Sequence, residues 1–254
     1  MCTFDSIEEL QKLKDHHPQM KCVLRIATKA TCTNAIYNLS EKYGALMDEI
    51  REILLKAKEL EMNVPGVSFH VGSGGVVFDA YKNSLYDAKK VFEIAEEIGM
   101  DKMNLVDIGG GFSYVVPGTG GNFNEVAPQI SDLVDELFPD RSIRIIAEPG
   151  RYISESVSYA CSQIMGTKNV DGTKHYFINN GIYTDYTVRI HDEKTLMDPL
   201  DPKHASERPM IKSTWWGRTS DSCDWILKNE EFPQLEEGEW IVSKDLGAYI
   251  RELS

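Results

Sequence analysis

The sequence predicts an α/β fold in which a parallel, barrel-type domain precedes a mainly β domain. From the start of the chain to about Arg151, short apolar runs alternate with amphipathic helical stretches, as in repeated βαβ units. After Arg151 the helical periodicity stops, and β-rich runs follow that are separated by turns containing Asp, Gly and Pro. We therefore expect two domains, 1–151 and 152–254.

Two helices are predicted in the first half, one from a start signal and one from a clear apolar face. Asp5-Ser6 precedes the amphipathic segment 7–13, and a serine in that place caps a helix. The segment 47–62 places five apolar residues on one helical face: Ile50, Ile53, Leu54, Ala57 and Leu60. Both segments are typical of surface helices that pack on a sheet.

Strands are predicted where short runs are apolar and rich in β-branched residues, as buried parallel strands are. In the first half these runs are 22–28, 67–71, 104–108 and 143–148; in the second half they are 176–178, 187–190 and 240–242. A closed (β/α)8 barrel needs eight strands, and about five or six can be placed. We therefore expect a partial TIM-type barrel.

Composition excludes several classes of protein. The 254 residues carry 27 Lys and Arg against 40 Asp and Glu, a formal net charge of −13 that repels a phosphate backbone. No apolar run approaches the roughly 18 residues of a membrane span, and the start has no leader pattern. Five cysteines without a C-x-x-C pair indicate reduced thiols. We expect a cytoplasmic protein that binds neither nucleic acid nor membrane.

Three predicted loops at strand ends carry unusual residues, and in barrels the chemistry gathers on such loops. His70 is followed by a Gly-Ser-Gly turn, so that its imidazole and the Ser73 hydroxyl could face an anion. The alternative is a core histidine that is hydrogen-bonded to a backbone carbonyl, with Ser73 as a helix cap. Gly109, Gly110 and Gly111 let main-chain N–H groups approach a phosphate, or alternatively form a plain flexible turn. Glu148-Pro149-Gly150-Arg151 supplies a carboxylate and an arginine, or a structural ion pair.

Together these loops offer a ring stacker, a phosphate cradle and a carboxylate, a set that fits pyridoxal 5′-phosphate (PLP). The sequence also resembles the eukaryotic ornithine decarboxylase family from about residue 1 to 249. Later motifs match that family in order: Asn179-Asn180-Gly181-Ile182-Tyr183, His191-Asp192, Trp216-Gly217-Arg218-Thr219-Ser220-Asp221 and Gly247-Ala248-Tyr249.

The resemblance implies a role for each site residue. His70 would stack on the pyridine ring and Glu148 would pair with its nitrogen, which keeps the ring cationic. Asp192 and Asp221 would hold the distal amine of a small cationic diamino acid, one from each subunit of a head-to-tail homodimer. The phosphate ligands would be Ser73, Gly109, Gly110, Gly111, Gly150, Arg151 and Tyr249.

Three departures from the family pattern keep alternatives open. First, no lysine lies in the Ala-Val-Lys-Cys-Asn context of the family's Schiff-base lysine, so we expect the chain to begin in mid-barrel. Second, we expect the chain to stop before the last strand of the β domain. Third, Ser220 stands where the family has a catalytic cysteine, and a hydroxyl is a weaker acid than a thiol of pKa about 8.5.

The favoured hypothesis is a PLP-dependent ornithine decarboxylase that forms putrescine for polyamine biosynthesis. One alternative is a non-catalytic regulator of the antizyme-inhibitor type, which would act by binding an antizyme-like partner. Another is a related lysine, arginine or diaminopimelate decarboxylase. Asp221 favours ornithine over diaminopimelate, because diaminopimelate decarboxylases carry a Cys-Glu-Ser arrangement at this segment.

Overall fold

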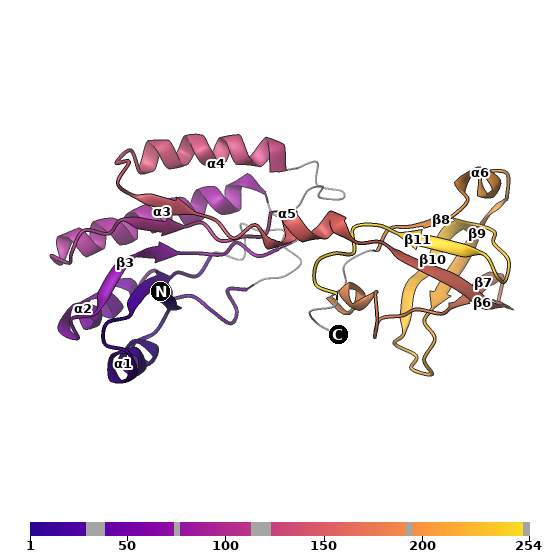
Figure 1. Ribbon diagram of the computed structural model, residues 1–254, viewed down its shortest axis with the longest axis horizontal. Coiled ribbons are helices and arrows are strands. Elements are labelled where there is room, and N and C mark those ends of the chain that lie inside the picture. The colour runs from indigo at the N-terminus through magenta and orange to yellow at the C-terminus, as the bar shows by residue number, and fades with distance from the viewer. Residues whose placement is uncertain (29–38, 74–76, 113–122, 192–194, 251–254) are drawn as a thin grey trace. The chain divides into compact units, whose positions relative to one another are not determined.

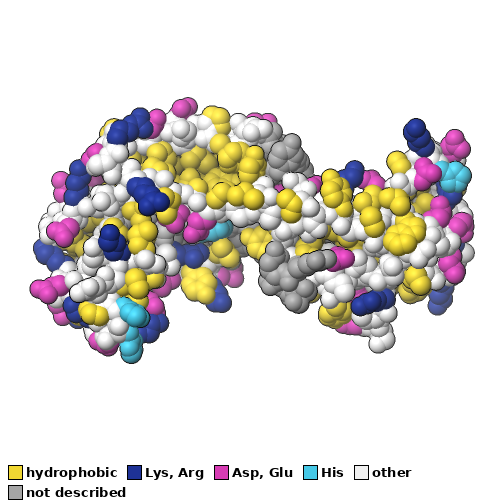
Figure 2. Space-filling model, viewed as in Figure 1, with side chains coloured by type: hydrophobic (Ala, Val, Ile, Leu, Met, Phe, Trp, Pro, Cys, Tyr) yellow, Lys and Arg dark blue, Asp and Glu magenta, His cyan; other side chains and the backbone are white. Residues whose placement is uncertain are grey.

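The computed structural model describes residues 1–28, 39–73, 77–112, 123–191 and 195–250 (Figure 1). The chain divides into two compact units, Met1–Tyr152 (unit 1) and Ile153–Ser254 (unit 2). In the described part of the chain, every helix is too short or too polar to cross a membrane. On the face in view, Lys and Arg side chains lie singly among acidic ones (Figure 2).

Unit 1 is a parallel sheet with helices between its strands, as predicted. The strands run in the order β1-β2-β3-β4-β5, and all four pairings are parallel. Their bounds are β1 Cys2–Phe4, β2 Lys21–Arg25, β3 Asn63–Ser68, β4 Leu105–Asp107 and β5 Arg144–Ile146. Four of them overlap or adjoin the predicted runs, whereas β1 was not predicted because three residues are too few to show a period.

The first four helices of unit 1 carry their apolar faces into one core, whereas the residue that the fifth helix buries is Arg151. The helices are α1 Ile7–His16, α2 Ile50–Glu59, α3 Phe78–Glu97, α4 Phe123–Leu137 and α5 Gly150–Ser154. Ser6 caps α1 as predicted, accepting a hydrogen bond from the amide of Glu9 at 3.2 Å. Ile50, Ile53, Leu54 and Ala57 of α2 are all buried, which confirms the predicted face.

Strand β3 differs from the prediction in its start. It begins at Asn63 and includes Pro65 and Gly66, two residues that normally signal a turn. A register shift against β2 in this stretch accommodates the proline. Gly66 is required by packing, because a Cβ atom there would lie 1.9 Å from the carbonyl oxygen of Leu105 on the neighbouring strand.

Unit 2 is a six-stranded sheet in the order β10-β9-β7-β6-β11-β8, antiparallel except for the β7–β9 pair. Its strands are β6 Ala160–Val170, β7 Thr173–Ile178, β8 Met197–Pro199, β9 Met210–Trp216, β10 Trp225–Pro233 and β11 Trp240–Ser243, with the short helices η2 Glu155–Val157 and α6 Pro202–Ala205. The buried Trp215 stacks on Tyr176 with ring centroids 4.2 Å apart and anchors the core. The predicted runs 176–178 and 240–242 lie in β7 and β11.

The predicted strand 187–190 is wrong. Thr187–His191 forms a 3₁₀ helix, η3, although three of its five residues are β-branched. The Thr187 hydroxyl donates to the carbonyl of Thr184 at 3.0 Å, and the Arg189 amide donates to that of Tyr186. These local bonds, with Tyr186 and Val188 buried in the core, override the strand propensity.

Candidate cofactor site

The loops that follow β3, β4 and β5 pack directly on one another, and glycine makes this packing possible. Cβ atoms at Gly109, Gly110 and Gly111 would lie 2.2 Å from the carbonyl oxygen of Phe69, 2.2 Å from that of Glu148 and 1.8 Å from that of Gly72. Gly109 and Gly111 also have φ values of +66° and +88°, which favour glycine. The three glycines therefore form a tightly packed loop.

His70 lies at the end of β3 with its imidazole held in one orientation. Its Nδ1 accepts a hydrogen bond from the amide of Gly72 at 3.1 Å, which leaves the proton of the neutral ring on Nε2. Burial and the nearby charge of Arg25 lower the pKa of His70 to about 4. The ring is therefore neutral at physiological pH, which suits stacking on a cationic ring.

Arg151 and Ser73 join the loops after β5 and β3. The Nε of Arg151 donates to the Ser73 hydroxyl at 2.9 Å, and only 5% of Arg151 and 1% of Ser73 is exposed. A guanidinium group stays charged when buried, so unit 1 holds a fixed positive charge beside the glycine loop. Gly150 begins α5, and its amide donates to the Glu148 carbonyl at 2.8 Å.

Two carboxylates and an arginine surround the same strand ends. Arg25, Ser68 and Asp107 are paired residues across β2, β3 and β4, so their side chains share one face of the sheet. Asp107 accepts a hydrogen bond from the Gly109 amide at 2.9 Å. Burial raises the pKa of Asp107, and burial together with the charge of Asp107 raises the pKa of Glu148; Arg25 opposes both shifts.

Arg25 and Asp107 were not predicted as site residues. The signal was present, because each is a charged residue inside a short, otherwise apolar strand, where an unpaired charge is costly. Their functional meaning comes only from the strand register, which places them beside residues from distant parts of the chain.

In unit 2, Ser220 and Asp221 lie exposed on the loop 217–224 between β9 and β10. Asp221 accepts hydrogen bonds from the Tyr183 hydroxyl and from the Cys223 amide, and these bonds lower its pKa. A cavity of about 420 Å³ borders this loop, and its walls include Lys168, Trp216, Ser220 and Asp221. A basic and an acidic side chain thus face the same space.

Asp224, not predicted, ties this loop to the segment that carries Tyr183. It is 1% exposed, its Oδ1 accepts from the Ile182 amide at 2.9 Å, and its Oδ2 accepts from the Thr219 amide and hydroxyl at 3.0 and 2.7 Å. Gly217 leaves room for this carboxylate, because a Cβ atom there would lie 2.0 Å from its Oδ1. Asp224 thereby sets the shape of the loop that presents Asp221.

Tyr249, in unit 2, has a φ of +59°, a left-handed conformation that is costly for a bulky residue. The preceding Gly247 lies so close to the 154–158 segment that a Cβ atom would come within 1.7 Å of the Ser154 carbonyl oxygen. The Gly247 amide donates to the Glu155 carbonyl at 3.0 Å.

The predicted site residue Asp192 lies outside the described residues.

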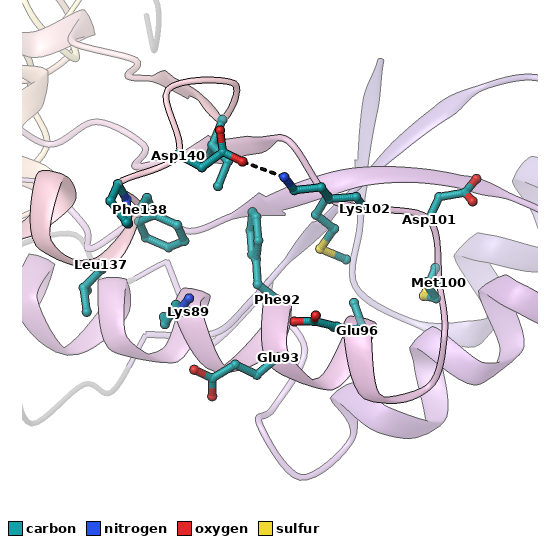
Figure 3. A pocket seen from close by; sticks show the side chains of 14 residues that line it. Lys89, Phe92, Glu93, Glu96, Met100, Asp101, Lys102, Leu137, Phe138 and Asp140 are labelled. Carbon is teal, nitrogen blue, oxygen red and sulfur yellow. Dashed lines mark hydrogen bonds and ion pairs between the residues drawn. The ribbon is translucent and has the colours of Figure 1, made fainter.

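A second cavity of about 420 Å³ lies in unit 1 beside the segments that precede β4 and β5 (Figure 3). Phe92 and Phe138 meet edge to face in its wall, with centroids 5.3 Å apart. Lys102 donates to Asp140 at 2.6 Å at its rim. It borders the amino ends of the strands, where barrel folds place structural rather than chemical residues.

The family described as pyridoxal-dependent decarboxylase, pyridoxal binding domain, matches residues 1–155. The chain belongs to this decarboxylase family. Antizyme inhibitor 2 of Xenopus laevis is 37% identical to it over 98% of the chain, and ornithine decarboxylase of Mus musculus is 36% identical over 98%. The chain spans 57% and 56% of the lengths of these two relatives.

Solved structures agree with this assignment. The arginine decarboxylase of Paramecium bursaria Chlorella virus, bound to agmatine, superposes on the decarboxylase chain with a TM-score of 0.89 and 34% identity, covering 99% of this chain and 67% of that one. The lysine/ornithine decarboxylase of Vibrio vulnificus with putrescine has a TM-score of 0.80 and 25% identity, covering 98% and 63%. A partial α/β barrel followed by a β domain is therefore confirmed.

PLP is the cofactor of the decarboxylase family, and the residues of unit 1 suit it. The buried Arg151 offers positive charge for a phosphate, and Ser73 holds that side chain in place. Within the described part of the chain, the amides of Gly110 and Gly111 donate no hydrogen bond, so both remain available to an anion. The neutral His70 and the carboxylate of Glu148 match the flat, basic ring.

Proposed function

We propose that the protein decarboxylates L-ornithine with PLP, giving putrescine and carbon dioxide. The observation that carries this proposal is the cluster of strand-end loops in unit 1. It combines a buried arginine, two glycine amides that donate no hydrogen bond to any described residue, a neutral histidine and a carboxylate. A binding protein that made no use of the cofactor would gain nothing from this set, because buried charge is costly to maintain.

When bound, PLP supplies a ring that accepts the electron pair left behind when the carboxylate of the substrate departs as carbon dioxide. Arg151 and the amides of Gly110 and Gly111 would bind its phosphate. Glu148 would hold a proton on the ring nitrogen. Because burial and the charge of Asp107 raise its pKa, that carboxylate would share a proton more readily than a carboxylate of ordinary pKa.

The substrate would be recognised in unit 2. Two hydrogen bonds lower the pKa of Asp221, and this carboxylate would bind the cationic distal amine of ornithine. We propose that Asp192 and Asp221 bind this amine together, one from each subunit of a head-to-tail homodimer located in the cytoplasm. Ser220 would return a proton to the α-carbon, less readily than a cysteine, because a hydroxyl is a much weaker acid.

A second candidate is a non-catalytic regulator of the antizyme-inhibitor type. One sequence fact favours it: Ser220 stands where the family has its catalytic cysteine. Overall sequence similarity does not decide between the regulator and the enzyme. The relative at 37% identity is an antizyme inhibitor, and the relative at 36% identity is an ornithine decarboxylase.

The deciding experiment titrates the chain with PLP and measures release of labelled carbon dioxide from carboxyl-labelled ornithine, lysine and arginine. We expect PLP binding. Because no lysine of these 254 residues lies in the Schiff-base context of the family, we expect slow release, fastest from ornithine and faster in Ser220→Cys. Asp221→Asn should weaken ornithine use while leaving PLP binding intact. PLP binding without release from any of the three would favour the regulator, and absence of PLP binding would contradict both the decarboxylase and its cofactor site.

A further inference from the structure

Tyr81 contacts the glycine loop from the side of helix α3. It is 1% exposed, and its hydroxyl donates to the carbonyl oxygen of Gly110 at 2.8 Å. Its ring stacks on Phe112, with centroids 5.1 Å apart and planes 5° from parallel. One side chain therefore holds the loop at two points.

The ring and the hydroxyl of Tyr81 have separable roles. The apolar surroundings of the ring would accept phenylalanine equally well, whereas a buried hydroxyl needs a partner, and among the described residues it finds one in the Gly110 carbonyl. Burial raises the pKa of Tyr81 far above its ordinary value, so the hydroxyl remains a donor at any physiological pH. The hydroxyl is thus a permanent donor to one chosen carbonyl.

The bond to Gly110 also orients the next amide. The peptide between Gly110 and Gly111 is planar and trans, so its N–H points opposite to its C=O. Because the C=O is directed at Tyr81 on α3, the N–H of Gly111 is directed away from that helix. Consecutive glycines otherwise have the greatest backbone freedom of any sequence, and ordering them on binding would weaken affinity.

We propose that Tyr81 is a positioning residue whose hydroxyl preorganises residues 109–111 for the phosphate group of PLP. This inference rests on the proposed function only in taking PLP as the ligand. Tyr81 lies outside the strand-end loops, and its hydroxyl would strengthen binding of the phosphate group without affecting binding of the pyridine ring.

The test compares Tyr81→Phe with Tyr186→Phe, which removes a buried hydroxyl of unit 2 that contacts Ser162 and Ser243 at 3.2 and 3.1 Å. Dissociation constants are measured for PLP and for pyridoxal, which lacks the phosphate. We expect Tyr81→Phe to weaken PLP binding about three- to tenfold, the range of one hydrogen bond, and to leave pyridoxal binding unchanged. Tyr186→Phe should change neither.

Amide hydrogen exchange of the cofactor-free chain supplies a second readout. We expect faster exchange at 109–112 in Tyr81→Phe and not in Tyr186→Phe. Unchanged PLP affinity with unchanged exchange would overturn the positioning role, as would a Tyr81→Phe chain that fails to fold, since the hydroxyl would then serve the core. A wild-type chain that binds no PLP would refute the proposed function, while the exchange comparison would still judge Tyr81.

Discussion

The strand-end loops of unit 1 and the loop 217–224 of unit 2 present polar groups in opposite ways. In unit 1 several of the polar groups are themselves buried, among them Arg151, Ser73 and Asp107, and the loops at the strand ends are in mutual contact. In unit 2, Ser220 and Asp221 are exposed, and a different residue, the buried Asp224, holds the loop. In unit 1 the same residues would therefore bind the ligand and stabilise the fold. In unit 2, Asp224 stabilises the loop, and the neighbouring Asp221 is left free to bind.

The difference follows from the chemistry each region would perform. A phosphate and a ring need preformed charge and donors in a site that excludes water, which packing provides. A flexible diamino acid needs only a carboxylate at a set distance, which an exposed loop can offer. Mutations should therefore destabilise unit 1 wherever they touch its site, whereas unit 2 should tolerate changes at Asp221.

The largest effect is expected from Gly111→Ala. The added Cβ would lie 1.8 Å from the Gly72 carbonyl oxygen, and the φ of +88° is strained for alanine. We expect a loss of about 3 kcal/mol or more in the unfolding free energy of unit 1, measured by denaturant titration. The control is Gly166→Ala in unit 2, where no atom lies within 4 Å; it should cost less than about 1 kcal/mol. Equal losses of unfolding free energy in Gly111→Ala and Gly166→Ala would contradict the idea that the site loops of unit 1 are held by close packing.

A pH-dependent effect of similar size is expected from His70. Its pKa of about 4 lies below the ordinary value of 6.5, so the unfolded chain binds more protons between these values. Stability contributed by the neutral ring is present above pH 6.5 and is lost as the pH falls toward 4, by up to about 3 kcal/mol. Unfolding free energies at pH 7, 5.5 and 4.5 should therefore fall less steeply in His70→Gln. Parallel curves for the two proteins would show that His70 is not held neutral.

The smallest of the three effects separates two aspartates of one loop. Asp224→Asn replaces an acceptor of three hydrogen bonds with a group that also donates, and should cost about 2 kcal/mol. The exposed Asp221→Asn should leave the unfolding transition where it was. Denaturant titration of both variants checks this, and a large loss in Asp221→Asn would mean that the loop couples function to stability as unit 1 does.

Much of the site was predictable because its residues lie in short motifs at strand ends. His70, the glycines 109–111 and Glu148 to Arg151 stand out by composition alone, and the structure brings them into one cluster. Arg25, Asp107 and Tyr81 were missed because their neighbours in the sequence are ordinary strand and helix residues. Their importance comes from contacts with residues about 30 to 120 positions away.

The sequence by itself determined the alternation of strands and helices, the capping of α1 by Ser6 and the family to which the chain belongs, since periodicity and motifs are local properties. Tertiary structure alone decided that 187–191 is a 3₁₀ helix, that β3 includes Pro65 and Gly66, and that Asp224 rather than Asp221 holds its loop. For β3 and for Asp224 the deciding interaction is a close contact or a hydrogen bond with a distant residue. For 187–191 it is the burial of Tyr186 and Val188, which accompanies the local hydrogen bonds. Burial sets the strength of these interactions, and only the folded chain defines burial.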